Sequence, residues 1–192
     1  MTNIKVKKLH KDAIIPKRAH ASDAGFDLYA LEDAVIEPGE TALVKTGLAF
    51  ELPEGFEMQI RPRSGITLKT KLRVQLGTID AGYRSEVGVI VDNINHENCL
   101  DDGDFEFSPF DITDEVASNS GVYKYGTYLI RKGDRICQAV IQRLPDVELI
   151  EVEELGDSER GAGGFGSTGV SSEKTWKEAF DEMIEKAKKG SD

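Results

Sequence analysis

The sequence predicts an all-β fold of the sandwich or jelly-roll type. Short segments in which apolar and polar residues alternate are separated by turns rich in glycine and proline, such as Pro38-Gly39 and Pro53-Glu54-Gly55. Before the C-terminal tail, no segment shows the 3.6-residue period of an amphipathic helix. Many short strands with turns at this spacing are typical of two packed antiparallel sheets.

Length and composition describe a soluble globular protein with one substantial domain and an appendage. Of its 192 residues, 39% are hydrophobic and 31% charged, and the net charge is −11. This acidity argues against direct nucleic-acid binding but allows a small phosphorylated ligand where a few arginines converge. No apolar run approaches the roughly 20 residues of a membrane span, and the N-terminus lacks a signal-peptide core. We therefore expect a cytoplasmic protein without a membrane partner. Cys99 and Cys137 lack the spacing of a zinc or disulfide site.

The first part of the chain predicts four strands in order. They lie at residues 4–6, 22–30, 42–52 and 56–60. In the second of them, apolar residues alternate with polar ones such as Asp27, as in a half-buried strand. The Pro-Glu-Gly turn between the last two predicts a hairpin.

Residues 133–144 and 147–152 predict the last two strands of the sheet. Successive side chains of a strand point to opposite faces. In residues 133–144, we expect the face with Cys137, Ala139 and Ile141 to be the buried one.

Residues 77–89, GTIDAGYRSEVGV, predict a strand, a tight turn and a second strand. Such a hairpin would hold a carboxylate, Asp80, and an aromatic ring, Tyr83, a few residues apart. This pairing suits an enzyme that places a base and a stacking platform beside one small ligand. The alternative is an ordinary turn in which Tyr83 covers part of the core.

Two further segments carry groups suited to phosphate binding. In RPRSGI, residues 61–66, Arg63 offers a planar guanidinium, and the following Ser-Gly pair offers a hydroxyl and close backbone approach. In RGAGGFGSTG, residues 160–169, five of ten residues are glycine. This inventory suits a mobile lid, with Phe165 stacking on a ring and its polar neighbours contacting phosphate. For residues 61–66, the alternative is a solvated turn. For residues 160–169, the alternative is a plain linker, which would not explain the presence of Phe165.

Residues 94–127 differ from the rest of the chain. They contain eight acidic residues and one basic residue, Lys124. Phe105 and Phe107 alternate with polar residues, as do Phe110 and Ile112. We therefore expect a small β-extension from the sheet, with a polar tip at residues 118–121.

After residue 175 the apolar period changes to that of a helix. A Thr175…Glu178 capping box precedes apolar residues at helical spacing: Trp176, Ala179, Phe180, Met183, Ile184 and Ala187. Because the charges of this segment are balanced, we expect it to dock on its own assembly or on a partner rather than on a membrane.

Five segments in this order resemble the motifs of the homotrimeric dUTPases (dUTP diphosphatases). They are DAGFDL at 23–28, RPRSG at 61–65, GTIDAGYR at 77–84, GDRICQ at 133–138 and RGAGGFGSTG at 160–169. The resemblance implies a jelly-roll trimer with three active sites, each assembled from all three subunits. It implies hydrolysis of dUTP to dUMP and pyrophosphate with Mg²⁺. The chain would divide into a core at 1–93 and 128–159, an insert at 94–127, a lid at 160–169 and a C-terminal helix at 170–192.

The resemblance also implies roles for single residues. Asp80 would orient and deprotonate the attacking water, Tyr83 would pack under the deoxyribose, and Asp27 would anchor a water molecule of the magnesium shell. Uracil would be held by the backbone of the hairpin, at Gly77 and Ile79. Phosphate oxygens would be held by Arg63, Ser64, Gly65 and Gln138. The residues that would close over the nucleotide are Arg160, Phe165, Gly166, Ser167 and Thr168.

An insert at this point resembles that of phage-encoded dUTPases from Gram-positive hosts. If the protein is phage-encoded, its expected location is the cytoplasm of the host cell. Some members of that group also bind the repressor of a mobile genetic element, which suggests the same partner for residues 94–127 by analogy. Two other functions stay open: a bifunctional dCTP deaminase/dUTPase, and a mainly regulatory binding protein. The complete lid motif argues against the first, and the intact Asp80, Arg63 and Arg160 argue against the second.

Overall fold

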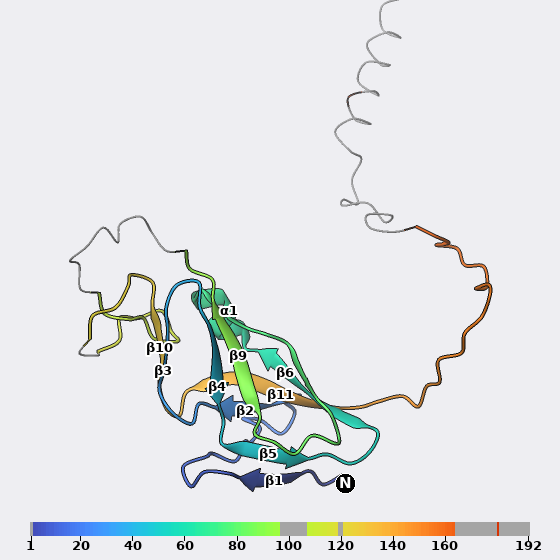
Figure 1. The fold of residues 1–192 in the computed structure, drawn as a ribbon, viewed down its shortest axis with the longest axis horizontal. Helices are drawn as coiled ribbons and strands as arrows, with labels where there is room; N and C mark the ends of the chain where they lie inside the picture. The colour runs from blue at the N-terminus through green and yellow to red at the C-terminus, as the bar shows by residue number, and fades with distance from the viewer. Residues whose placement is uncertain (1, 97–106, 119–120, 164–179, 181–192) are drawn as a thin grey trace, which may run out of the picture. The chain divides into compact units, whose positions relative to one another are not determined.

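A computed structural model gives the structure of the chain and describes residues 2–96, 107–118, 121–163 and 180 (Figure 1). By their contacts, residues Met1–Val147 form one compact unit and Glu148–Asp192 a second. Over residues 2–96, 107–118 and 121–163, the regular secondary structure is β apart from one six-residue helix. No helix among them is long and apolar enough to cross a membrane.

The largest sheet has four antiparallel strands. It contains β2 (Gly25–Tyr29), β6 (Phe56–Pro62), β8 (Gly77–Ile79) and β11 (Arg135–Arg143), in the order β2-β11-β6-β8. The long strand β11 pairs with β2 on one side and β6 on the other. Four of the five dUTPase-like motifs therefore lie on or beside neighbouring strands of one sheet.

A second sheet has three strands, β4 (Thr41–Lys45), β9 (Gly88–Asn93) and β7 (Leu72–Val74), in the order β4-β9-β7. The helix α1 (Ser64–Lys69) connects β6 to β7. Two antiparallel pairs complete the fold. They join β1 (Lys5–Lys8) to β5 (Leu48–Glu51), and β3 (Ala34–Ile36) to β10 (Tyr128–Ile130).

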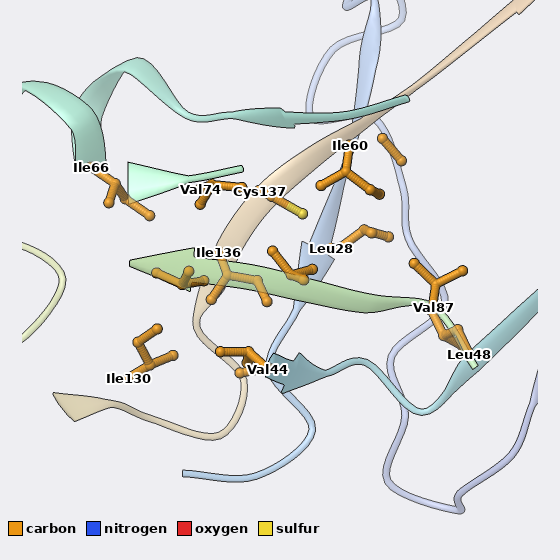
Figure 2. Close-up of a cluster of buried hydrophobic side chains, with 14 of the residues drawn as sticks. Leu28, Val44, Leu48, Ile60, Ile66, Val74, Val87, Ile130, Ile136 and Cys137 are labelled. Atoms are coloured by element: carbon orange, nitrogen blue, oxygen red, sulfur yellow. The ribbon is translucent and has the colours of Figure 1, made fainter. Parts of the chain in front are cut away.

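One apolar core joins the two larger sheets (Figure 2). Leu28, Ile60 and Cys137 come from the four-stranded sheet, and Val44 and Val74 from the three-stranded sheet. Burying a side chain of this kind contributes about 1.5–3 kcal/mol of hydrophobic free energy. The core confirms the all-β sandwich that the alternating pattern predicts, and it supports the strands that carry the motifs.

Two predicted hairpins are wrong. The strand before the Asp-Ala-Gly turn, β8, pairs with β6, whereas β9 pairs with β4 and β7. The Pro-Glu-Gly turn likewise joins β5, which pairs with β1, to β6, which pairs with β11 and β8. Turn residues bend the chain locally, but they do not determine which strand becomes the partner.

The boundaries of other predicted elements also change. The strand predicted at 42–52 is two strands, separated at Thr46-Gly47, where Gly47 has φ +69°. Residues 64–69 form the helix α1, which is too short to show an amphipathic period. Residues 147–152 form no strand, and their apolar side chains are exposed. In β11, Ile136 is buried as well as Cys137, and the register of β11 against β2 shifts between Arg135 and Cys137.

The inserted segment contains isolated β-bridges rather than strands among its described residues. Phe107 bridges to Tyr123, and Phe110 bridges to both Val116 and Tyr128. The ring of Tyr125 lies edge-on to Phe107 and Phe110, with centroid distances of 5.3 and 5.9 Å. Phe105 and residues 119–120 of the tip lie outside the described residues, and so does the predicted C-terminal helix apart from Phe180.

Candidate active site

One group of predicted site residues gathers where β2, β11 and β6 lie side by side. Asp27 of β2 is a register partner of Gln138 in β11, and Gln138 is in turn a partner of Arg61 in β6. Asp27 is only 8% exposed. The structure thus brings the first, second and fourth motifs together.

Two arginines hold the buried Asp27 carboxylate. The Arg63 Nε lies 3.5 Å from Asp27 Oδ1, and the Arg135 Nε lies 3.7 Å from Oδ2. The Arg63 Nη1 also donates a hydrogen bond of 2.7 Å to the carbonyl oxygen of Arg135. Arg63 is therefore held from both sides, in a place where its remaining N–H groups can meet an anion.

Ser64 and Gly65 follow directly at the start of α1, and both are exposed. A Cβ placed on Gly65 would meet no atom within 4 Å. Packing of the chain on itself therefore does not require glycine here. The open space beside Gly65 leaves room for a ligand to approach the backbone.

Sequence reasoning missed two residues of this group, Arg135 and Gly25. Arg135 lies inside the GDRICQ motif, and the signal available in the sequence is its charge three residues before Gln138. A Cβ on Gly25 would lie 3.1 Å from Gln138 Cβ and 3.4 Å from its Oε1. Gly25 therefore leaves the Gln138 side chain its space.

Cys137 lies beneath this group and is fully buried. Burial raises the pKa of its thiol to about 12, and the nearby Asp27 acts in the same direction while Arg63 opposes it. The thiol stays protonated at neutral pH, so Cys137 acts as a small core residue rather than as a nucleophile.

A second group lies on the loop after β8. Asp80 is exposed, and its carbonyl oxygen accepts a hydrogen bond of 3.0 Å from the Tyr83 N–H, which closes the turn. The Tyr83 ring is 40% exposed, and its hydroxyl donates to the carbonyl oxygen of Glu86 at 3.0 Å. Arg84 donates to the carbonyl oxygens of Ala81 and Tyr83. The loop therefore presents a carboxylate and a ring on a turn that is hydrogen-bonded internally.

The two groups lie at opposite ends of β6. Gly77 pairs with Ile60 and Ile79 with Met58, so the chain runs past Met58 toward the start of β6 when it reaches Asp80. Arg63 instead follows the other end of β6. Along β6, the six residues from the level of Asp80 to Arg63 span about 20 Å of extended chain. Within one chain, Asp80 and Arg63 therefore do not face the same phosphorus atom.

Most of the predicted lid lies outside the described residues. This applies to Phe165, Gly166, Ser167 and Thr168. Arg160 is described, in the second unit, where its Nε donates to the carbonyl oxygen of Gly163 at 3.0 Å.

Comparison with known proteins agrees with the motif resemblance. The dUTPase family model matches residues 11–99 and 122–169, and the gap falls within the predicted insert. The deoxyuridine 5′-triphosphate nucleotidohydrolase of Clostridioides difficile is 46% identical over 171 residues, which cover 88% of this chain and 99% of that protein. The enzyme of the same name from Nautilia profundicola is 45% identical over 168 residues, covering 86% and 98%.

Solved structures show the same fold. The dUTPase of Staphylococcus bacteriophage 80alpha with dUPNHPP aligns with a TM-score of 0.81 and 40% identity, covering 88% of this chain and 100% of that one. The dUTPase of the S. aureus phage phi11, described with a species-specific insert, aligns with a TM-score of 0.74 and 37% identity, covering 80% and 97%.

Fold and comparisons together define a jelly-roll nucleotide hydrolase, with an arginine-bound carboxylate on one sheet and an exposed carboxylate and ring on the loop after β8. The chain belongs to the dUTPase family. It is a dUTP diphosphatase.

Proposed function

We propose that the chain hydrolyses dUTP to dUMP and pyrophosphate by water attack at the α-phosphorus, with Asp80 as the base. The observation that carries this proposal is the exposed Asp80 on the internally hydrogen-bonded turn after β8. A carboxylate in this position has room for a water molecule beside it, and the turn limits its movement. The reaction limits dUTP and supplies dUMP.

The Asp27 group would bind the triphosphate. Arg63, Ser64, Gly65 and Gln138 would hold phosphate oxygens, which matches the convergence of arginine and amide donors there. Their positive charge would oppose the charge that accumulates on the leaving pyrophosphate.

Mg²⁺ fits this group as an ion that arrives with the substrate. Within the part of the chain that the structure describes, no three acidic, histidine or cysteine residues gather into a metal cage. A single buried carboxylate, Asp27, suits Mg²⁺ because this ion keeps water and takes phosphate oxygens as ligands. Asp27 would anchor a water molecule of its shell, and the bound ion would supply charge neutralisation on the phosphates. The phage phi11 dUTPase has a structural Mg(II) ion.

The loop after β8 would bind the nucleoside. The Tyr83 ring would pack under the deoxyribose and leave no room for a 2′-hydroxyl. Among the strands that the structure describes, β8 is at the edge of its sheet, so its backbone groups on one side have no partner there. Gly77 and Ile79 would use such groups to bind the uracil edge.

A complete site would require more than one copy of the chain. The separation of Asp80 and Arg63 along β6 supports a site in which the loop of one copy faces the phosphate group of another. A closed homotrimer provides three such sites. The lid of the third copy would close over the nucleotide with Arg160, Phe165, Gly166, Ser167 and Thr168.

A second role as a protein-binding regulator is supported by the insert surface. Val116, Val122 and Tyr125 are 68%, 70% and 47% exposed within this acidic segment. Exposed apolar side chains surrounded by acidic residues suit a partner with a basic surface, such as a repressor protein. Related phage dUTPases are described as controlling the transfer of virulence genes.

The test of the main proposal is pyrophosphate release from dUTP, dTTP, dCTP and UTP, measured side by side. We expect release from dUTP alone at an appreciable rate. Equal rates with dTTP or UTP would contradict the proposed uracil and sugar binding. Release of ammonia from dCTP would instead identify the bifunctional deaminase.

A further inference from the structure

The loop that carries Asp80 and Tyr83 is fastened at its returning end to the break between β4 and β5. The Thr46 hydroxyl donates to the carbonyl oxygen of Val87 at 2.6 Å, and the Val87 N–H donates to the carbonyl oxygen of Leu48 at 2.8 Å. Beside these two bonds, the Gly47 N–H donates to Glu86 Oε1 at 2.7 Å. Glu86 is therefore the loop residue whose side chain is bonded to this break.

The same residue locates the Tyr83 ring. The ring is 40% exposed, so packing alone leaves it freedom to turn. The Tyr83 hydroxyl donates to the backbone carbonyl of Glu86 at 3.0 Å. A movement of the Glu86 backbone therefore moves the hydrogen-bond acceptor of this ring.

Gly47 is a fixed donor for the Glu86 side chain. Its φ of +69° favours glycine, and a Cβ here would lie 2.9 Å from Ala13 Cβ and 3.1 Å from Leu31 Cδ1. The residue is therefore restricted in both conformation and space. The direction of the Gly47 N–H is therefore fixed by its backbone conformation and by the neighbouring Ala13 and Leu31 side chains.

We expect the Glu86 side chain to act as a hydrogen-bond acceptor of the right length rather than through its charge. It lines an open hollow together with Lys45 and Lys132. These lysines form ion pairs with other acids, Lys45 with Glu32 at 3.3 Å and Lys132 with Asp12 at 2.6 Å. The acceptor that the Gly47 N–H needs is an oxygen at the end of a side chain of this length, which glutamine also provides.

We propose that Glu86 is a positioning residue for Tyr83 and so sets the discrimination between deoxyribose and ribose. The inference rests on the proposed packing of Tyr83 under the sugar. The Gly47 N–H holds the Glu86 side chain, and the Glu86 carbonyl holds the Tyr83 hydroxyl. With the first bond lost, the ring can move aside and admit a 2′-hydroxyl.

The test compares kcat/KM for dUTP and UTP in the wild type, Glu86→Ala, Glu86→Gln and Glu86→Asp. Loss of one hydrogen bond of about 1 kcal/mol predicts a fall of about fivefold in the dUTP/UTP ratio for Glu86→Ala. We expect this fall mainly through a lower KM for UTP, because the displaced ring admits the 2′-hydroxyl. Glu86→Gln should keep the wild-type ratio, and Glu86→Asp, which keeps the charge but is too short, should resemble Glu86→Ala.

Two variants make the outcome specific. Glu32→Ala removes another carboxylate of the same hollow and should leave the ratio unchanged. Tyr83→Ala tests the underlying role of the ring and should lower the ratio further than Glu86→Ala does. A wild-type ratio in Glu86→Ala together with a lowered ratio in Tyr83→Ala would overturn the inference alone, whereas a wild-type ratio in Tyr83→Ala would overturn the proposed sugar contact. A ratio kept by Glu86→Asp and lost by Glu86→Gln would also overturn it, because charge would then be the cause.

Discussion

Asp80 and Asp27 both have a carboxylate side chain, but Asp80 is exposed and Asp27 is buried. Asp27 is 8% exposed, and both of its oxygens face guanidinium groups, from Arg63 and Arg135. Asp80 is exposed on its turn. A base needs room for the water molecule whose proton it takes, whereas an anchor for a hydrated cation needs a fixed orientation. The surroundings therefore fit Asp80 as the base and Asp27 as the anchor.

Replacing Asp80 by asparagine should abolish turnover and keep binding. The amide preserves the shape of the side chain but removes its capacity to accept a proton, so we expect kcat to fall by at least about 100-fold. The dissociation constant of a non-hydrolysable dUTP analogue, measured by calorimetry, should stay near the wild-type value. A kcat within a few-fold of wild type would show that another group activates the water.

Tyr128 is a residue on which the stability of the insert depends. Its ring is 2% exposed, and its hydroxyl donates to Asp114 Oδ1 at 2.7 Å and accepts from the Lys71 N–H at 3.1 Å. Burial, reinforced by the hydrogen bond to Asp114, raises the pKa of this hydroxyl to about 12. The hydroxyl therefore remains a donor throughout the neutral range. Asp114 has φ 69°, a left-handed conformation that non-glycine residues rarely adopt.

Removing this hydroxyl should cost stability without affecting the chemistry. We expect Tyr128→Phe to lower the free energy of unfolding by about 1–3 kcal/mol, because two partly buried hydrogen bonds are lost. Tyr125→Phe is the matched control, since that ring is 47% exposed within the same aromatic cluster. Urea unfolding measures both variants. Equal stability of the two would contradict the assigned role of the Tyr128 hydroxyl.

At the scale of elements, the sequence predicts strands well but not their partners. The strands at 25–29, 56–62 and 135–143 follow from alternation, because one face of each is buried against the core. Alternation says nothing about which strand lies alongside, so the two hairpins were wrong. Residues 147–152 have the pattern of a strand but, within the described chain, no strand pairs with them.

The base of the insert belongs to the core rather than to a separate extension. The buried Asn93 side chain donates to the carbonyl oxygens of Ile36 and Gly126 at 3.0 and 2.9 Å. Phe110 accepts from the Leu129 N–H at 2.7 Å, and its ring packs against the core. Contacts with the core therefore hold the base of the segment in place. The acidic composition of the segment does not predict these contacts.

Replacing residues 95–126 with a short Gly-Ser turn should preserve dUTP hydrolysis and lower the melting temperature. Hydrolysis should persist because the predicted site residues lie outside the segment. The melting temperature should fall because Phe110 and Ile112 leave part of the core uncovered and Tyr128 loses Asp114. Pyrophosphate release and thermal unfolding measure the two effects. Lost hydrolysis in a correctly folded assembly would mean that the insert belongs to the active site.

At the scale of the whole molecule, the motifs predict a set of site residues, and the resemblance implies sites shared between subunits. The sequence does not say which of Asp27, Arg63, Gln138, Asp80 and Tyr83 lie together within one copy. The structure brings the first three together and places the other two at the far end of β6. Register along a strand depends on pairing, and pairing between distant segments leaves no local signal in the sequence. Gly25 and Arg135 were missed because their roles depend on neighbours across the sheet.

The central claim is that each active site combines Asp80 of one copy with Arg63 of another, and a mixing experiment tests it most directly. Asp80→Asn and Arg63→Ala chains are unfolded together, refolded as mixed assemblies and assayed for pyrophosphate release from dUTP, with each variant refolded alone as the control. If the two residues act from different copies, about a quarter of the sites in a random mixture receive both intact residues. The account therefore predicts that two inactive proteins regain about a quarter of the wild-type activity on mixing. Mixed assemblies, verified by native mass spectrometry, that stay as inactive as the separate variants would contradict it.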